Sequence, residues 1–92
     1  MNNSDDMHFV PGRLLMTSGV SKSVPDIVVA FALHSHLGCN WGDIGIGDWK
    51  QNDMALITGD RLLSRYNTPY GDIFIITEAD RSATTVLLTG EY

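Results

Sequence analysis

The chain is short of cysteine, of long hydrophobic runs and of basic residues. Its single cysteine, Cys39, cannot form a disulfide within the chain, so nothing indicates an oxidising compartment. The longest apolar run, from Ile27 to Leu33, is far shorter than the ~20 residues of a membrane-spanning helix. The first residues are polar and acidic, and no apolar stretch follows them. We therefore expect no secretory signal and a cytoplasmic protein.

Basic residues are scarce, with six Lys and Arg against eleven Asp and Glu and a formal net charge of −5. This balance argues against direct binding of nucleic acid, whose phosphates require a basic surface. The apolar fraction of 43% with only 18% charged residues excludes an intrinsically disordered chain. A length of 92 residues allows one small domain. We expect a flexible N-terminal tail over residues 1–8 and a single domain over residues 9–92.

Turn and capping residues predict the elements of the first two thirds of the chain. Residues 12–20 predict a strand. Ser23 is placed to cap a helix that runs to about Leu37, and Gly38 is expected to end it. Residues 48–58 predict a second helix, with a capping-box pattern at its start and a glycine after its end.

The last third of the chain predicts three strands, over residues 61–66, 73–78 and 84–89. A four-residue loop over 79–82 joins the last two as a hairpin. This loop sets the register, with these pairs: Phe74–Leu87 and Ile76–Thr85 on one face, and Ile73–Leu88, Ile75–Val86 and Thr77–Thr84 on the other. The expected fold is a small single α+β domain, in which strand, helix and helix are followed by a three-stranded antiparallel meander.

Both faces of this meander carry apolar side chains, and two helices can cover only one of them. One face is expected to be an apolar interface made by four residues: Leu63, Phe74, Ile76 and Leu87. A monomer rarely exposes such a patch, so we expect it to serve a protein partner or a homodimer. The alternative is that the N-terminal tail and the 67–72 loop, with Phe9 and Tyr70, fold over it.

His36 and Cys39 are spaced to act together as metal ligands or as a base and a thiol nucleophile. A structural zinc site requires four ligands, and the nearest other candidates are Asp43 and the distant His8. For catalysis, no third group or oxyanion donor is evident. We interpret the pair as structural and predict no metal, no cofactor and no catalytic residue. The glycine-rich segment 38–47 lacks the preceding strand and the lysine of phosphate-binding loops. Its glycines are therefore expected to allow positive φ and close packing between the helices.

Three residues are predicted to be structural: Trp41, Trp49 and Asn52. The two tryptophans are expected to be at least partly buried where the glycine-rich segment meets the second helix. Asn52 and Asp53 flank the apolar stripe of that helix and are expected to hydrogen-bond the backbone amides of the segment.

Charged residues on the segment, the second helix and the hairpin tip are the predicted partner-binding set. They are Asp43, Asp48, Asp53, Glu78, Asp80 and Arg81. At the tip, these charges are expected either to be simply solvated or to include a bridge from Arg81 to the Glu78 or Asp80 carboxylate. A local acidic patch of this kind suits a basic partner surface.

Motifs along residues 10–92 give a resemblance to a known family. They are His36-Leu37, Trp41-Gly42-Asp43, Asp48-Trp49, Asn52-Asp53, Ala55-Leu56, Arg61-Leu62-Leu63-Ser64 with Tyr66, Ile75-Ile76-Thr77-Glu78-Ala79-Asp80-Arg81-Ser82, Thr84-Thr85 and Glu91-Tyr92. The chain resembles a family of small bacterial proteins met on plasmids and other mobile elements. The resemblance implies a mobile-element accessory protein and supplies no catalytic residues. Cys39-Asn40 departs from the family pattern, which has Gly-Asp there.

We predict a small acidic accessory protein of a mobile element that binds another protein. The expected partner is a host defence complex, of the CRISPR or restriction type, inhibited through a basic surface. Literal DNA mimicry would require a negative charge every ~1.7 Å, which a net charge of −5 does not supply. The alternative is a small ligand-binding protein or enzyme that uses segment 38–47, with a lining of four residues: His36, Trp41, Asp43 and Asn52.

Overall fold

The structure is a computed structural model, and it describes residues 7–92. Residues 1–6 of the predicted tail lie outside the described residues. At the end of the predicted tail, the backbone N–H of His8 donates to the Leu37 carbonyl over 2.9 Å. The described chain therefore begins with a contact to the end of a helix.

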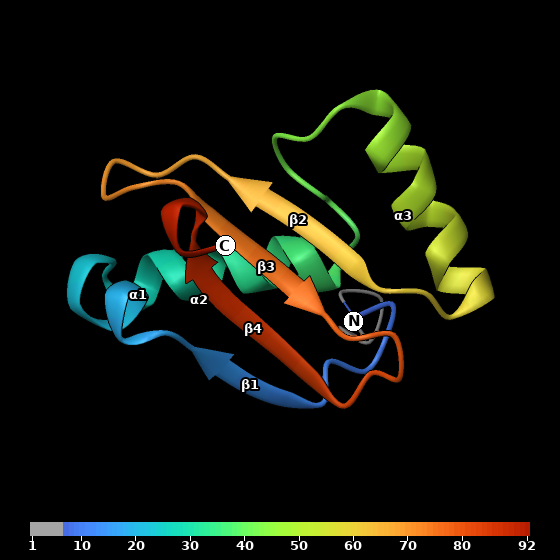
Figure 1. The fold of residues 1–92 in the computed structure, drawn as a ribbon, viewed down its shortest axis with the longest axis horizontal. Helices are drawn as coiled ribbons and strands as arrows, with labels where there is room; N and C mark the ends of the chain where they lie inside the picture. Colours follow the sequence, from blue (N-terminus) through green and yellow to red (C-terminus); the bar gives the residue numbers. More distant parts are fainter. Residues whose placement is uncertain (1–6) are drawn as a thin grey trace, which may run out of the picture.

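Residues 7–92 form three helices and four strands, whose arrangement Figure 1 shows. In chain order they are β1 (Arg13–Met16), α1 (Ser18–Ser23), α2 (Asp26–Leu37), α3 (Ile46–Thr58), β2 (Leu62–Tyr66), β3 (Ile73–Thr77) and β4 (Ala83–Leu88), followed by a 3-10 turn (Thr89–Glu91). The α+β class is confirmed, and the last three strands form the antiparallel meander. The sheet itself is larger than predicted, because β1 joins it parallel to β4 and gives the mixed order β1-β4-β3-β2.

The predicted first helix corresponds to α2, and a further short helix, α1, precedes it. The Thr17 side chain accepts a hydrogen bond from the Val20 N–H over 3.2 Å and starts α1 within the segment predicted as strand. Val24 then adopts an extended conformation, as the residue before a proline prefers, and this ends α1. α2 starts at Asp26 instead of Ser23, and it ends at Gly38 as predicted.

The start of α3 also differs from the prediction. The helix begins at Ile46, with Gly45 as its N-cap, so Asp48 lies inside the first turn and not at the cap. A carboxylate in the first turn still interacts favourably with the positive end of the helix dipole. The end of α3 is as predicted, because Gly59 follows it with φ +82°, a conformation that favours glycine.

The hairpin register is confirmed pair by pair along β3 and β4, from Ile73–Leu88 to Thr77–Thr84. The sheet therefore has one face with Ile73, Ile75 and Val86, which α2 covers, as Figure 1 shows. The core between α2 and this face consists of seven buried residues: Val20, Val24, Val29, Ala32, Ile73, Ile75 and Val86. α3 packs beside β2 at the edge of the sheet, so neither helix lies over the second face.

A chain of buried hydrogen bonds fastens α2 to the sheet through His36. The ring contacts Ser64 Oγ at Nδ1 (2.5 Å) and Thr77 Oγ1 at Nε2 (2.8 Å). Thr77 Oγ1 lies 2.8 Å from Thr84 Oγ1, and the Thr84 hydroxyl donates to the Pro11 carbonyl. Since a carbonyl can only accept, Thr77 must donate to Thr84, and His36 must donate to Thr77 from Nε2. The chain of hydroxyls therefore requires a hydrogen on Nε2. Because burial lowers the pKa of His36 to about 4, Nδ1 carries no hydrogen at neutral pH and accepts from the Ser64 hydroxyl.

The outer edge of β2 is sealed by groups from outside the strand. The Asn52 side chain donates to the Leu63 carbonyl over 2.6 Å and accepts from the Leu63 N–H over 3.2 Å. Farther along β2, the backbone N–H of Arg65 donates to the Trp41 carbonyl, and the Arg65 carbonyl accepts from the backbone N–H of Asp43. Gly42 permits this approach, because its φ is +79° and a Cβ there would lie 2.0 Å from the Arg65 carbonyl oxygen. The predicted close packing of Gly42 is thus against β2 and not between the helices.

Replacing Asn52 with leucine is expected to lower the free energy of unfolding by about 1–3 kcal/mol, because both backbone groups of Leu63 lose their partner. Denaturant unfolding followed by circular dichroism measures the change. Gln51→Leu, at the exposed neighbouring position, is the matched control and should leave stability nearly unchanged. Equal effects of the two substitutions would contradict the sealing role of Asn52.

Candidate interaction surface

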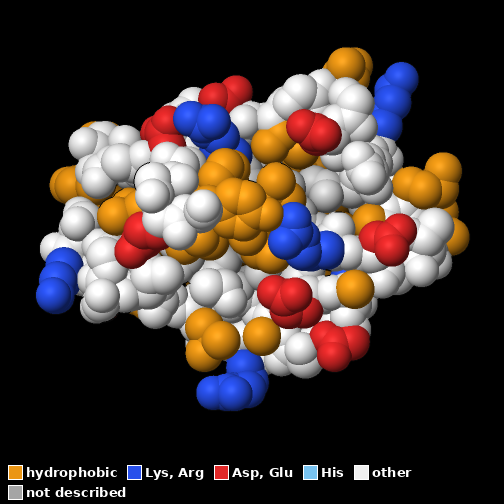
Figure 2. Space-filling view, in the orientation of Figure 1, with side chains coloured by type: hydrophobic (Ala, Val, Ile, Leu, Met, Phe, Trp, Pro, Cys, Tyr) orange, Lys and Arg blue, Asp and Glu red, His pale blue; other side chains and the backbone are white. Residues whose placement is uncertain are grey.

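The second face of the sheet carries the predicted apolar interface. The register places four residues together on this face: Leu63, Phe74, Ile76 and Leu87. We call it the open face, because α2 lies behind the sheet and α3 lies beside it (Figure 1). Figure 2 shows apolar side chains gathered at the centre of this face, with charged side chains around them.

Long side chains from the edges of the sheet cover part of the open face. The Tyr92 ring meets the Phe74 ring in a T-shaped contact with centroids 5.3 Å apart. Arg61 donates to the Tyr92 hydroxyl over 2.8 Å, and the Arg65 guanidinium lies 5.9 Å from the Phe74 ring centroid. Ile76 and Leu87 are buried, so only Leu63 and Phe74 of the predicted apolar interface are partly exposed, whereas Tyr92 itself is 63% exposed.

The N-terminal tail and the 67–72 loop do not provide this cover. Phe9 packs on the helix side of the sheet, where its ring lies 5.3 Å from His36 and 6.3 Å from Trp41. Tyr70 is 51% exposed. The alternative in which Phe9 and Tyr70 fold over the apolar interface is therefore wrong for residues 7–92.

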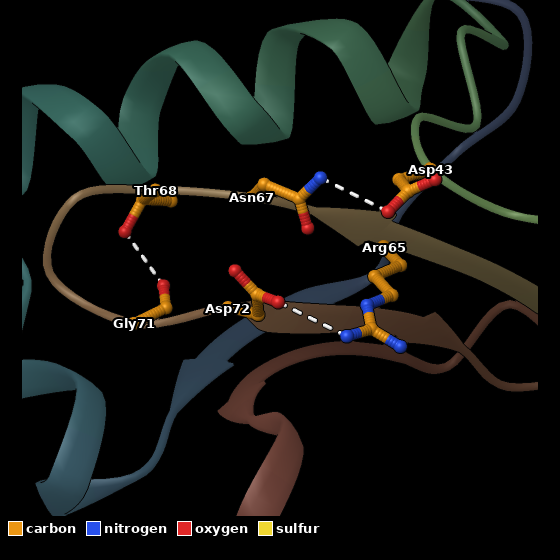
Figure 3. Close-up of polar contacts among 6 residues, drawn as sticks. All are labelled: Asp43, Arg65, Asn67, Thr68, Gly71 and Asp72. Atoms are coloured by element: carbon orange, nitrogen blue, oxygen red, sulfur yellow. Dashed lines mark hydrogen bonds and ion pairs between the residues drawn. The ribbon is translucent and has the colours of Figure 1, made fainter.

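The 67–72 loop is instead fixed by hydrogen bonds and an ion pair with neighbouring residues (Figure 3). Asn67 donates to the Asp43 carboxylate over 2.9 Å, and the Thr68 hydroxyl donates to the Gly71 carbonyl over 2.6 Å. Asp72 forms an ion pair with Arg65 at 3.0 Å. This pair fixes the guanidinium that covers Phe74 and so joins the loop to the open face.

A groove of about 350 Å³ lies between α3 and β2 at the side of the open face. Its lining combines acidic, amide, basic and apolar side chains: Asp48, Gln51, Asn52, Ala55, Asp60, Arg61 and Leu63. Leu63 belongs to both the groove and the open face, so the two form one continuous surface. Two carboxylates and one guanidinium give the groove an acidic character.

The predicted acidic partner-binding residues are spread over several elements. Arg81 donates to the backbone carbonyls of Asp60 (2.7 Å) and Glu78 (3.1 Å), which gathers these residues and Asp80 at one end of the sheet. The alternative of a bridge from Arg81 to the Glu78 or Asp80 carboxylate is wrong, because backbone carbonyls accept from the guanidinium, including those of Ala55 and Ala79. Together with Asp48 in the groove, the carboxylates of Asp60, Glu78 and Asp80 form what we call the acidic rim.

Two further members of that set have local partners. Asp43 accepts from Asn67, and Asp53 accepts from the Trp41 indole N–H over 3.0 Å. The prediction that Asn52 and Asp53 bond backbone amides of the glycine-rich segment is wrong, because Asn52 bonds β2 instead. Trp41 is fully buried and Trp49 is partly buried in one cluster, as expected.

Burial sets the protonation of both His36 and Cys39. His36 is fully buried, and burial, helped by the positive charge of Arg81, lowers its pKa to about 4. Burial also raises the pKa of the Cys39 thiol, and the nearby Asp53 carboxylate raises it further. A protonated thiol is a poor nucleophile. Over residues 7–92, no three His, Cys, Asp or Glu side chains lie close enough together to hold a metal ion.

The residues of the alternative ligand site are not brought together on an accessible surface. His36 and Trp41 expose none of their area, and Asn52 is occupied by β2. Asp43 lies at the surface beside Asn67. Fully buried side chains cannot contact a ligand, so this set offers no common lining.

Sequence reasoning missed Arg61, Arg65 and Tyr92 as parts of the surface. Arg61 and Arg65 flank Leu63 at alternate positions, so the strand period of two places all three on one face. That signal was present in the sequence, whereas nothing in the sequence indicates that Tyr92 folds back onto the sheet.

In the part of the chain that is described, no helix has the length and apolarity needed to cross a bilayer. Comparisons of the chain with family models, with curated proteins and with solved structures found no match.

Proposed function

We propose that this chain is a protein-binding module whose partner docks on the open face. The observation that carries the proposal is a continuous surface with an apolar floor, aromatic and arginine side chains and a groove, over which no helix of residues 7–92 lies. Tyrosine and arginine are the residue types that most often dominate binding energy at protein interfaces. Tyr92, Arg61 and Arg65 supply them here, next to Phe74 and Leu63.

The acidic rim sets the charge expected of the partner. The negative charges of its carboxylates are only partly balanced by the guanidiniums of Arg61 and Arg81. The Arg81 guanidinium donates to backbone carbonyls. A partner with an apolar centre and basic residues at its edge complements this surface. On the sequence resemblance, we propose a host defence complex as that partner, bound by an accessory protein of a mobile element. Purification of the tagged chain from its native host, followed by mass spectrometry, identifies the partner.

Charge reversal at the acidic rim is expected to slow association with that partner. Glu78→Lys combined with Asp48→Lys should lower the association rate constant by about tenfold at low salt, because rim charges steer encounter. The effect should shrink as salt rises, since exposed charges are screened within ~8 Å at physiological ionic strength. Surface plasmon resonance over a salt series measures both quantities.

Asp26→Lys is the matched control, because Asp26 begins the helix on the other side of the sheet. Per unit of net charge changed, Asp26→Lys should lower the association rate constant much less than the double reversal does. Affinity that is independent of salt, or equal slowing by both reversals, would contradict a role for the acidic rim.

A further inference from the structure

The two edges of the sheet differ in how their backbone groups are paired. At β2, Asn52 and the segment around Gly42 take up the outward N–H and C=O groups of Leu63 and Arg65. At β1, no other segment of residues 7–92 forms a ladder beyond the strand, which lies along the lower edge of the sheet in Figure 1. An unpaired edge of this kind is a template for another strand.

The parallel pairing of β1 with β4 determines which groups point outward. The Arg13 N–H donates to the Ser82 carbonyl over 3.0 Å, and the Thr17 N–H donates to the Val86 carbonyl over 3.1 Å. Since donors alternate along a strand, the N–H and C=O groups of Leu14 and Met16 face away from the sheet.

Past Arg13 at its start, β1 has no charged side chain that would protect its outer edge. Leu14, Leu15 and Met16 are 56%, 40% and 44% exposed, and no proline, lysine or glycine interrupts the strand. Proteins usually blunt an exposed edge with charge, proline or a bulge. Three exposed apolar residues on an unpaired edge therefore indicate an interface.

We propose that β1 pairs antiparallel with β1 of a second copy of this chain around a twofold axis at Leu15. In this register Leu14 of each copy pairs with Met16 of the other, and Leu15 lies opposite Leu15. It is the register in which both outward-facing residues of each strand, Leu14 and Met16, find hydrogen-bonding partners. The pairing turns two four-stranded sheets into one continuous sheet.

Charge complementarity favours the second copy over an unrelated strand. The same register places Arg13 of one copy opposite Thr17 of the other. The Thr17 hydroxyl donates to the Glu91 carboxylate over 2.8 Å, so Glu91 stands at that end of the edge. Arg13 therefore meets Glu91 of the second copy, and the symmetry repeats this pair at the other end.

The pairing also has a consequence for the proposed function. Directly opposite residues of paired strands point to the same face, so the two open faces lie on the same side of the joined sheet. The dimer would offer two partner sites facing one direction, which raises avidity for a partner with two copies of its own site.

Sedimentation velocity over a micromolar concentration series tests the pairing. The wild type is expected to form dimers, and Leu15→Glu should be monomeric, because it puts two like charges at the axis. Arg13→Glu should raise the dissociation constant of the dimer about tenfold. Arg13→Glu combined with Glu91→Arg should restore it, while Glu91→Arg alone should not.

Phe74→Asp is the control on the open face and should leave the dimer intact, so failure of this inference is distinct from failure of the proposed function. Circular dichroism of each variant checks the fold. A wild type that stays monomeric throughout would overturn the inference and leave β1 to a strand of another protein. A dimer that Phe74→Asp splits and Leu15→Glu does not would overturn it as well, by placing the interface on the open face.

Discussion

Trp41→Ala is expected to lower the free energy of unfolding by about 3–5 kcal/mol. The indole is fully buried, packs with Phe9 and Leu62, and donates its N–H to Asp53. The substitution removes the largest fully buried side chain of the described chain and leaves the Asp53 carboxylate without its donor. A small domain has only ~5–15 kcal/mol of stability, so the variant should be partly unfolded at room temperature. Denaturant titration followed by circular dichroism measures the loss.

Trp49→Ala is the matched control, because it removes the same side chain from a partly buried position in the same cluster. Its cost should be clearly smaller than that of Trp41→Ala. Equal costs, or a Trp41→Ala variant that melts like the wild type, would show that the segment around Trp41 does not contribute to the core as described.

Acidification is expected to destabilise the fold through His36 before most carboxylates titrate. The pKa of His36 is about 4 in the folded protein, chiefly because of burial, whereas an unfolded histidine titrates near ~6.5. Between these values the unfolded chain binds the proton more readily, so the stabilisation is complete above pH ~6.5 and is lost as the pH falls toward ~4. The total is roughly 3 kcal/mol, at up to ~1.4 kcal/mol per pH unit.

Equilibrium unfolding at pH values from ~5 to ~6.5 measures this slope above the range of most carboxylates. His36→Gln should remove the histidine part of the slope, and His34→Gln, on the exposed side of the same helix, should keep it. Nitrogen NMR of the wild-type ring should show the neutral Nε2–H tautomer across this range. A ring protonated on both nitrogens at pH ~6 would contradict the lowered pKa of His36 and the acceptor role of Nδ1 toward Ser64.

Local sequence signals were sufficient for the meander but not for the complete sheet. The four-residue loop over 79–82 and alternating β-branched residues fix the register of β3 with β4, because hairpin pairing is local. The parallel pairing of β1 with β4 joins segments about seventy residues apart, and no turn residue encodes it. The break between α1 and α2 was encoded by Pro25, which forces Val24 into an extended conformation.

The candidate surface shows the same division between local and distant information. Strand alternation was enough to place Leu63 and Phe74 on one face. It could not show that Tyr92 folds back onto Phe74, because that contact depends on the 3-10 turn after β4. The hydrogen bonds of Arg81 could not be predicted either, because its guanidinium donates to the Ala55 carbonyl near the end of α3, which is distant in the sequence.

The most direct test of the open face as the partner site is a capture experiment with two matched variants. Phe74→Asp places a carboxylate on the open face, and Phe31→Asp places one on the outer side of α2, where Phe31 is 69% exposed. Each tagged protein, once shown to fold by circular dichroism, is purified from the native host beside the wild type. We expect the wild type and Phe31→Asp to retain the same partner and Phe74→Asp to lose it. Retention by Phe74→Asp together with loss by Phe31→Asp would contradict the account and place the partner on α2.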